Sequence, residues 1–168
     1  MMTDKGASHR AYIGLGSNLD EPIEQIKRAM GELARLTKSR VVHCSRLYKS
    51  KPMGPQGQAD FINAVVELHT TLKPAKLLLE LQALERQHQR GHGGPRWGPR
   101  TLDLDILLYG DTIMHETDLD IPHPGMHERD FVLYPLYDIN PDIKIPGRGD
   151  IKTLMRQCPD YGVQAIQI

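Results

Sequence analysis

Two aspartates follow a group of arginines within one short stretch of this chain, Arg96–Leu108 (R-W-G-P-R-T-L-D-L-D-I-L-L). Asp103 and Asp105 alternate with apolar residues, which is typical of a β-strand that carries both carboxylates on one face, about 7 Å apart. Two like charges at this spacing repel each other unless a cation or a proton lies between them. Carboxylates suit Mg²⁺, which binds one or two of them together with phosphates and water. The pattern therefore predicts a magnesium site or, as the alternative, a strand with a solvated acidic edge.

The segment that precedes the aspartates is cationic, because residues 86–100 include four Arg and two His and no acidic residue. A guanidinium group can bind phosphate through two parallel hydrogen bonds. This segment beside a carboxylate pair indicates phosphoryl chemistry, with metal on the carboxylates and arginine on phosphate oxygens. A solvated basic loop is the alternative. The single tryptophan, Trp97, favours a glycine-rich loop that is mobile and closes over a ligand.

Several common nucleotide-binding and metal-binding patterns are absent from the sequence. It has no G-x-x-x-x-G-K-[ST] motif, no kinase signature and no Cys/His cluster with zinc spacing. Gly14-Leu15-Gly16 begins like a dinucleotide-binding motif, but Leu19 stands where the third glycine is required. These absences argue against P-loop enzymes, protein kinases and dinucleotide-binding enzymes.

The length and composition are those of one globular domain. The chain has 168 residues, with 21 basic and 21 acidic side chains, so no overall charge favours nucleic acid or a membrane surface. Cys44 and Cys158 are too few for a disulfide framework and indicate a reducing compartment. No apolar run is long enough for a bilayer, and the start of the chain lacks a signal-peptide core. We expect a cytoplasmic protein with a disordered lead, residues 1–9, and one domain, residues 10–168.

Hydrophobic periodicity places the site residues on regular elements. It predicts strands at 11–15, 41–48, 61–69 and 101–109, helices at 22–37, 71–89 and 124–139, a hairpin within 113–121, and a short helix from Asp150. Gly and Pro predict loops at 49–60 and 91–99. This order predicts an α+β fold, a ferredoxin-like α/β sandwich with a mostly antiparallel sheet flanked by helices.

Finer details of two helices also follow from the sequence. Asp20 and Pro22 are a plausible cap and first-turn pair for the helix at 22–37. In the helix at 124–139 we expect four side chains to face inward, namely Phe131, Leu133, Leu136 and Tyr137.

Four blocks of the sequence resemble, in order, the 6-hydroxymethyl-7,8-dihydropterin pyrophosphokinase family of folate biosynthesis. They are Y-I-G-L-G-S-N-L at residues 12–19, P-M-G-P-Q-G-Q-A-D-F-I-N-A at 52–64, the stretch at 96–108, and I-P-H-P-G-M-H-E-R-D-F-V-L-Y-P-L at 121–136. The resemblance implies transfer of pyrophosphate from ATP to the pterin hydroxymethyl group, with release of AMP. It also implies small-molecule partners only, and we expect a monomer that binds neither nucleic acid nor membrane.

The resemblance also implies a role for each matching residue. Two Mg²⁺ ions would bind Asp103 and Asp105, and the catalytic residues would be Arg90, Arg100, Asp103 and Asp105. ATP would contact Gln82, Glu85, Arg96, Trp97, Ile106, His123 and Arg129. The pterin would contact Ser50, Met53, Phe61, Asn63, Trp97 and Phe131, with the two phenylalanines on opposite faces of the ring.

The chain departs from the family pattern at a few positions, and two other functions remain as rivals. The departures are Lys51, Phe61, His92, Gly93, Asp118 and Asp120, and those at His92 and Asp118 bear on the strength of ATP binding. One rival is a two-metal phosphohydrolase that uses water as its nucleophile. The other is a nucleic-acid-binding module, which the neutral net charge and the two Phe disfavour.

Overall fold

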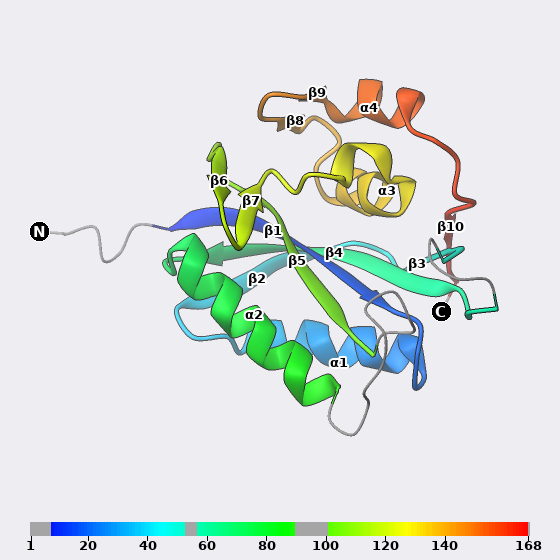
Figure 1. Ribbon diagram of the computed structural model, residues 1–168, viewed down its shortest axis with the longest axis horizontal. Coiled ribbons are helices and arrows are strands. Elements are labelled where there is room, and N and C mark those ends of the chain that lie inside the picture. Colours follow the sequence, from blue (N-terminus) through cyan, green and yellow to red (C-terminus); the bar gives the residue numbers. More distant parts are fainter. Residues whose placement is uncertain (1–7, 53–56, 90–100, 168) are drawn as a thin grey trace, which may run out of the picture.

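A six-stranded antiparallel sheet runs through the middle of the molecule, and helices cover both of its faces (Figure 1). The computed structural model describes residues 8–52, 57–89 and 101–167. The strand order is β10-β3-β4-β1-β5, and β2 pairs with β4 as well. The strands are β1 His9–Ser17, β2 Ser39–Cys44, β3 Tyr48–Ser50, β4 Phe61–Thr70, β5 Asp103–Tyr109 and β10 Gln164–Ala165.

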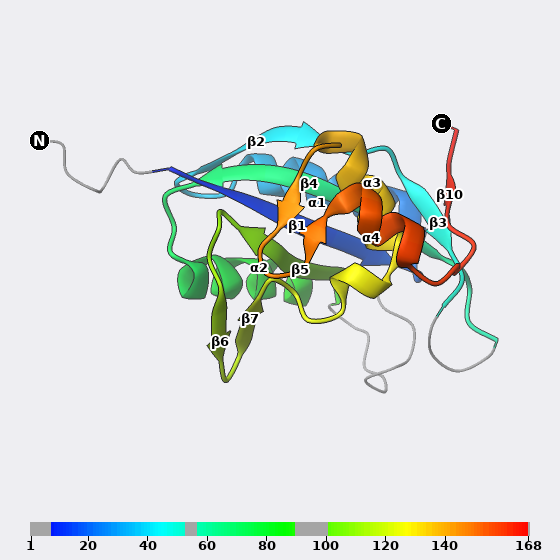
Figure 2. The ribbon, with the colours of Figure 1, turned by 90° about the horizontal axis from the view of Figure 1, so that it is seen from above.

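The helices lie in two layers, one on each side of the sheet (Figures 1 and 2). One layer holds α1, Pro22–Ala34, and α2, Pro74–His88; the other holds α3, Asp130–Ile139, and α4, Ile151–Gln157. The smaller elements are a 3₁₀ turn at Met126–Glu128 and two hairpins, β6 Met114–Glu116 with β7 Leu119–Ile121 and β8 Lys144–Ile145 with β9 Gly149–Asp150. The order β1-α1-β2/β3-β4-α2-β5 confirms the predicted ferredoxin-like α+β sandwich.

Alternation along the central strand β1 divides the apolar residues into two cores. Ala11, Ile13 and Leu15 pack in the core beneath α1 and α2, whereas Tyr12 packs in the core beneath α3 and α4. Gly14 and Gly16 share the Tyr12 face, since side chains alternate along a strand. At Gly14 and Gly16 the face of β1 that points towards α3 therefore has no side chain. The candidate site lies over these two glycines.

The strand predicted at 41–48 is two strands, because Ser45 interrupts it. Ser45 forms two hydrogen bonds with the backbone of Val65 in β4. Ser45 N donates to Val65 O at 2.9 Å, and Val65 N donates to the hydroxyl oxygen of Ser45 at 2.9 Å. Because a side-chain oxygen replaces a backbone carbonyl, the ladder breaks and Arg46 turns out towards α3. A period-two pattern does not reveal such a substitution.

The helix predicted at 124–139 begins later than expected. Arg129 has extended backbone angles (φ −123°, ψ 107°), which separate the 3₁₀ turn from α3. Leu133 and Leu136 are buried as predicted, and Phe131 is half-buried. The prediction for Tyr137 is wrong: it is 36% exposed, because Tyr134 and Tyr137, three residues apart, share the solvent side of the helix.

The remaining predictions differ from the structure only in detail. The residue that caps α1 is Glu21, in the left-handed region at φ 59°, and not Asp20, whose carbonyl accepts a hydrogen bond from Gln25 Nε2 at 3.0 Å. Pro22 does occupy the first helical turn. β1 starts at His9, inside the predicted lead, and the predicted loop at 91–99 lies outside the described residues. None of the described helices is long and apolar enough to cross a membrane.

Candidate functional site

One predicted carboxylate, Asp103, and the predicted pterin-binding amide, Asn63, lie in one row across three strands. Gly16 of β1 pairs with Asn63 of β4 on one side and with Asp103 of β5 on the other. Residues directly opposite each other in an antiparallel sheet share a face, so Asn63 and Asp103 are two strand spacings, about 10 Å, apart. Gly14 pairs with Asp105 in the next row on the same face. Both carboxylates thus share one face of the strand, as predicted, and that face is the α3 side of the sheet.

Because Gly16 has no side chain, the space between the side chains of Asn63 and Asp103 is open. A Cβ atom at this position would lie 3.4 Å from Asn63 Oδ1 and 3.8 Å from Phe61 Cδ1. The α-hydrogen of glycine therefore leaves a flat backbone floor, bordered by Asn63, Phe61 and Asp103. A planar ligand laid on this floor would have an amide at one edge and a carboxylate at the other.

A hydrogen bond to Ser50 fixes the orientation of the Asn63 amide. Asn63 Nδ2 donates to Ser50 Oγ at 2.8 Å, and both residues are buried, at 6% and 2% exposure. Because the nitrogen is engaged, the oxygen Oδ1 is the atom that borders the floor. The arrangement offers an acceptor to a ligand that carries N–H donors on its edge. The structure therefore brings together Ser50, Phe61 and Asn63, three of the predicted pterin residues.

Glu85 of α2 and Gln89, the residue that follows α2, hold the strand that carries the carboxylates. β5 is the last strand in the sheet order, so within the described residues one side of its backbone has no neighbouring strand. Glu85 Oε2 accepts a hydrogen bond from Leu104 N at 2.7 Å, and Gln89 Nε2 donates one to Leu102 O at 3.1 Å. Leu104 lies between the two aspartates. Glu85, predicted to contact ATP, thus also positions the backbone of the carboxylate pair.

His123 lies beside Asp105, with 3.9 Å between Nε2 and Oδ2. Its Nδ1 accepts a hydrogen bond from Gly125 N at 3.1 Å, so the ring proton is on Nε2, the atom that faces the carboxylate. Burial, together with the positive charges of Arg129 and Arg148, lowers the pKa of His123 to about 4. The imidazole is therefore neutral at pH 7, and its contact with Asp105 is not an ion pair.

Asp105 is close to both solvent and a cation. Burial raises the pKa of its carboxyl, while the positive charge of Arg129 opposes this effect. The side chain is nevertheless 51% exposed, so water reaches it. Asp105, His123 and Arg129, three predicted residues, are thus brought together beside the row.

Arg129 also connects the carboxylates to the first turn of α3. Its guanidinium carbon is 6.0 Å from the centre of the Phe131 ring, and a Cβ at Gly125 would come within 3.2 Å of the same guanidinium. Phe131 is half-buried and packs against the core beneath α3 and α4. The helix start thus presents a cation and an aromatic ring on the side of the sheet where the row lies.

The donor set around the carboxylates suits a hard divalent cation that brings further ligands with it. Asp103 and Asp105 supply oxygen, which Mg²⁺ prefers. Among residues 8–52, 57–89 and 101–167, no group of three or more His, Cys, Asp or Glu side chains could hold a metal ion. Two carboxylates without a closed protein cage match an ion that is completed by phosphate and water.

The other predicted residues lie in different places. Gln82 is half-buried on α2, one turn before Glu85, on the same side of the helix. The Ile106 side chain is 3% exposed in the core beneath α1 and α2, so it points away from the carboxylates. Five predicted residues lie outside the described part of the chain, namely Met53, Arg90, Arg96, Trp97 and Arg100.

Two residues outside the predicted site set contribute to this region: Asn18, which the sequence indicated as a brace for the turn after β1, and Arg148. Asn18 Nδ2 donates to Gln58 Oε1 at 3.0 Å and to Ala59 O at 3.1 Å, and so ties the end of β1 to the segment before β4. Arg148 Nη1 donates to His123 O at 2.6 Å. The position of Asn18 in the turn sequence G-S-N pointed to a structural role for its side chain. Arg148 lies between two glycines far along the chain, and no sequence pattern there predicts a contact with His123.

Comparisons with known proteins agree with this geometry. Residues 12–141 match the family model described as 7,8-dihydro-6-hydroxymethylpterin-pyrophosphokinase (HPPK). The chain is 48% identical over 151 residues to the 2-amino-4-hydroxy-6-hydroxymethyldihydropteridine pyrophosphokinase of Haemophilus influenzae, covering 90% of this chain and 94% of that protein. It is 46% identical over 157 residues to the protein of the same name from Pseudomonas aeruginosa, with coverage of 94% and 96%.

The fold also matches solved structures. A crystal structure of wild-type Plasmodium falciparum HPPK-DHPS with pteroate superposes with a TM-score of 0.71 at 14% identity, over 89% of this chain and 42% of that one. At this identity the likeness shows the fold alone, and the family rests on the sequence matches. The four blocks, the row of Asn63, Gly16 and Asp103, and the family model all lead to one assignment: this chain belongs to the 7,8-dihydro-6-hydroxymethylpterin-pyrophosphokinase family.

Proposed function

We propose that this protein transfers the pyrophosphoryl group of ATP to the hydroxymethyl group of 6-hydroxymethyl-7,8-dihydropterin and releases AMP, as a step of tetrahydrofolate synthesis. The observation that carries the proposal is the row across the sheet, with an amide acceptor at one end and a carboxylate at the other. A flat heterocycle on the Gly16 floor would present its N–H edge to Asn63 and its substituent to Asp103.

The residues at the pterin end of the site would fix the orientation of the pterin ring. Asn63 Oδ1 would accept from the N–H edge of the ring, and Ser50 holds the amide so that the oxygen and not the nitrogen faces the floor. Phe61 borders the same floor, and Phe131 at the start of α3 would cover the opposite face of the ring. Met53 and Trp97 stay proposed contacts on the strength of the sequence resemblance. A fixed acceptor discriminates against ligands that lack the matching donor, because the buried oxygen would then have no partner.

The nucleotide end carries the polar and cationic groups. Arg129 and the Nε2–H of His123, beside Asp105, would donate hydrogen bonds to phosphate oxygens. Glu85 would keep the backbone between the carboxylates in place, and we retain Gln82 and the backbone of Ile106 as nucleotide contacts. Arg90, Arg96 and Arg100 are proposed to neutralise charge on the triphosphate as it builds up during transfer.

Asp103 and Asp105 would hold Mg²⁺, two ions by the family resemblance. When bound, Mg²⁺ neutralises phosphate charge and lowers the pKa of a bound hydroxyl group. The site then needs no strongly basic side chain at the attacking oxygen. The paired carboxylates and the absence of a third acidic ligand among the described residues support this assignment.

The experiment that tests the function is an AMP-release assay with omissions. Purified protein is incubated with ATP, Mg²⁺ and 6-hydroxymethyl-7,8-dihydropterin, and nucleotides are separated by chromatography. We expect AMP and a pyrophosphorylated pterin only when all three components are present. AMP or ADP formed at the same rate without the pterin would contradict the proposal and restore the two-metal phosphohydrolase, which the family assignment does not support.

We further propose that the protein acts as a cytoplasmic monomer. The balanced charge and the two cysteines support an intracellular enzyme of small molecules. Light scattering coupled to gel filtration tests the oligomeric state: a mass of one chain is expected, and a dimer mass at micromolar concentration would contradict it.

A further inference from the structure

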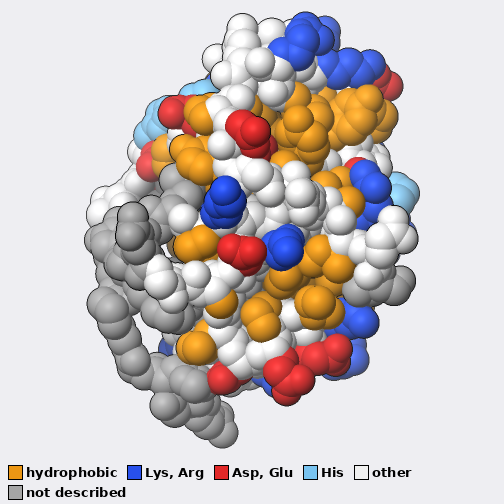
Figure 3. All heavy atoms as spheres, turned by 90° about the vertical axis from the view of Figure 1, so that its right-hand side faces the viewer, with side chains coloured by type: hydrophobic (Ala, Val, Ile, Leu, Met, Phe, Trp, Pro, Cys, Tyr) orange, Lys and Arg blue, Asp and Glu red, His pale blue; other side chains and the backbone are white. Residues whose placement is uncertain are grey.

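The C-terminal segment after α4 connects the two walls of the proposed pterin site. β10 pairs with β3, with Gln164 opposite Lys49 and Ala165 opposite Tyr48, and Ile166 N donates to Leu47 O at 2.9 Å. Figures 1 and 2 both show this last strand beside β3. The same side of the molecule carries hydrophobic side chains grouped between single charged groups (Figure 3). The segment is therefore held along β3, whose last residue is the Ser50 that orients Asn63.

Before it reaches β3, the segment is fastened to the start of α3. Tyr161 N donates to Asp130 Oδ2 at 2.8 Å, and Asp130 is only 4% exposed. Tyr161 O accepts a longer hydrogen bond, 3.5 Å, from Lys51 N, the residue after β3. The backbone of Tyr161 thus joins the first turn of α3 to the end of β3 through its own donor and acceptor.

The side chain of Tyr161 meets the aromatic ring next to that anchor. The rings of Tyr161 and Phe131 are 6.0 Å apart between centres at an angle of 75°, an edge-to-face contact. The guanidinium of Arg129 lies 6.0 Å from the centre of the same Phe131 ring. Phe131 stands at the helix start, where a half-buried side chain has room to rotate unless its neighbours prevent it.

We propose that Tyr161 is a positioning residue that holds the Phe131 ring in the orientation that receives the pterin. This inference rests on the proposed function, and in particular on Phe131 as one face of the pterin site. Tyr161 acts through Phe131: its ring packs against the edge of Phe131, and Asp130 and Lys51 fix its backbone. The proposed ATP contacts lie beside Asp105 and on α2, and of these Arg129 also lies against the Phe131 ring. Loss of the Tyr161 contact should therefore affect ATP binding much less than pterin binding.

The test compares Tyr161→Leu with Tyr161→Phe. Edge-to-face aromatic pairs contribute about 0.5–1.5 kcal/mol, so we expect Tyr161→Leu to raise the KM for the pterin about two- to tenfold. The KM for ATP and kcat should stay within about twofold of wild type. Tyr161→Phe, which retains the ring, should restore the wild-type KM for the pterin. Tyr137→Leu, a tyrosine on the solvent side of α3, is the matched control and should change none of these constants.

Three outcomes would overturn the positioning role: an unchanged KM for the pterin in Tyr161→Leu, an equal rise in both KM values, or a Tyr161→Phe variant as impaired as Tyr161→Leu. Melting temperatures of all variants exclude unfolding as the cause, and calorimetric titration with the pterin measures the same affinity without turnover. Failure of the wild-type protein to release AMP in a pterin-dependent way would instead contradict the proposed function, so the two failures are distinguishable.

Discussion

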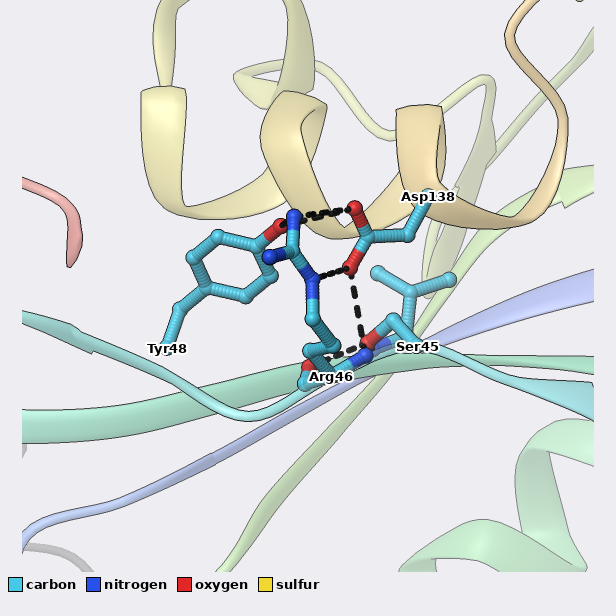
Figure 4. A network of polar contacts seen from close by, with 5 residues as sticks. Ser45, Arg46, Tyr48 and Asp138 are labelled. Carbon is cyan, nitrogen blue, oxygen red and sulfur yellow. Dashed lines mark hydrogen bonds and ion pairs between the residues drawn. The ribbon is translucent and has the colours of Figure 1, made fainter. Parts of the chain in front are cut away.

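The hydroxyl group of Tyr48 donates a hydrogen bond of 2.8 Å to Asp138 Oδ1 and so joins β3 to the last turn of α3 (Figure 4). Arg46 completes the contact, because its backbone N, Nε and Nη2 all donate to the same carboxylate at 3.2, 3.1 and 2.9 Å. The arginine is free to reach α3 because Ser45 ends β2. This junction and the Asp130–Tyr161 hydrogen bond fasten the two ends of α3, whose first turn carries Phe131.

Removal of the Tyr48 hydroxyl should destabilise the fold measurably. Tyr48 is 3% exposed, and burial together with the Asp138 hydrogen bond raises its pKa to about 12, so the phenol stays a donor over the whole working range. A hydrogen bond to a charged group is worth about 1.5–3 kcal/mol. We expect Tyr48→Phe to lower the free energy of unfolding in urea by that amount. Tyr134→Phe, an exposed tyrosine on α3, is the control, and equal stability of the two variants would contradict the prediction.

The Asp138 junction should make stability depend on acidity. Burial raises the pKa of Asp138, but the hydrogen bonds from Arg46 and Tyr48 and the charge of Arg46 outweigh it and hold the pKa below its ordinary value. A carboxyl with a lowered folded-state pKa stabilises the fold above its unfolded pKa of about 3.9, and this stabilisation is lost as the pH falls through the folded-state value. Asp138→Asn should therefore be less stable than wild type at neutral pH and approach it in acid. A gap that stays constant down to about pH 2 would exclude this linkage.

Filling the floor of the site should weaken pterin binding without unfolding the protein. In Gly16→Ala the new methyl group would be 3.4 Å from Asn63 Oδ1 and 3.8 Å from Phe61, which are ordinary contact distances. A ligand lying on the floor would have to move away, and one misplaced methylene in a tight site costs about 1–3 kcal/mol. We expect the KM for the pterin to rise about tenfold or more, with a near-normal melting temperature.

Gly31→Ala provides the control for that experiment. A Cβ at Gly31 would meet nothing within 4 Å, and the position is inside α1. Alanine is favoured over glycine in a helix by about 0.5–1 kcal/mol, so this variant should be slightly more stable with unchanged KM values. If Gly16→Ala also leaves the KM for the pterin unchanged, the ring does not lie over Gly16.

The amide of Asn63 should matter for the pterin and not for ATP. Asn63→Ala removes the acceptor at the edge of the floor and should weaken pterin binding by about 1–3 kcal/mol, because a buried polar edge loses its partner. Calorimetric titrations with the pterin and with a non-hydrolysable ATP analogue measure the two affinities separately. Equal losses for both ligands would show that Asn63 has been placed at the wrong substrate.

Loss of either carboxylate should reduce turnover while the fold persists. Asp103→Asn and Asp105→Asn keep the size of the side chain and remove the charge that would hold Mg²⁺, so kcat should fall by at least about a hundredfold. A circular-dichroism spectrum reports the fold, and Asp111→Asn, an exposed aspartate after β5, is the charge-matched control. Near-normal activity in either variant at saturating Mg²⁺ would rule out the two-carboxylate site.

The sequence predicted the parts of the site that depend on local pattern. Alternation placed Asp103 and Asp105 on one face, and apolar spacing predicted β1, β4, β5, α1 and α2 to within a few residues. It did not predict the break between β2 and β3 or the late start of α3. The resemblance to one family supplied the roles, which rest on matched positions and not on geometry.

The parts that depend on contacts between distant segments could not be predicted in this way. That Gly16 would lie between Asn63 and Asp103 depends on the register of three strands, which only the packed sheet defines. The junction at Asp138 required the break at Ser45, and the contact of Tyr161 with Phe131 required a short strand, β10, that has no periodic signal. Two-residue strands are too short for a pattern to emerge.

The hydrogen bonds that Glu85 and Gln89 make to the backbone at the start of β5 also bear on aggregation. A bare outer strand attracts strands from neighbouring chains and is a common origin of aggregation. Glu85 and Gln89 occupy the amide of Leu104 and the carbonyl of Leu102, so an incoming chain finds those two positions already bonded. Glu85, which holds the carboxylate strand, therefore also blocks the pairing of a foreign strand at this position.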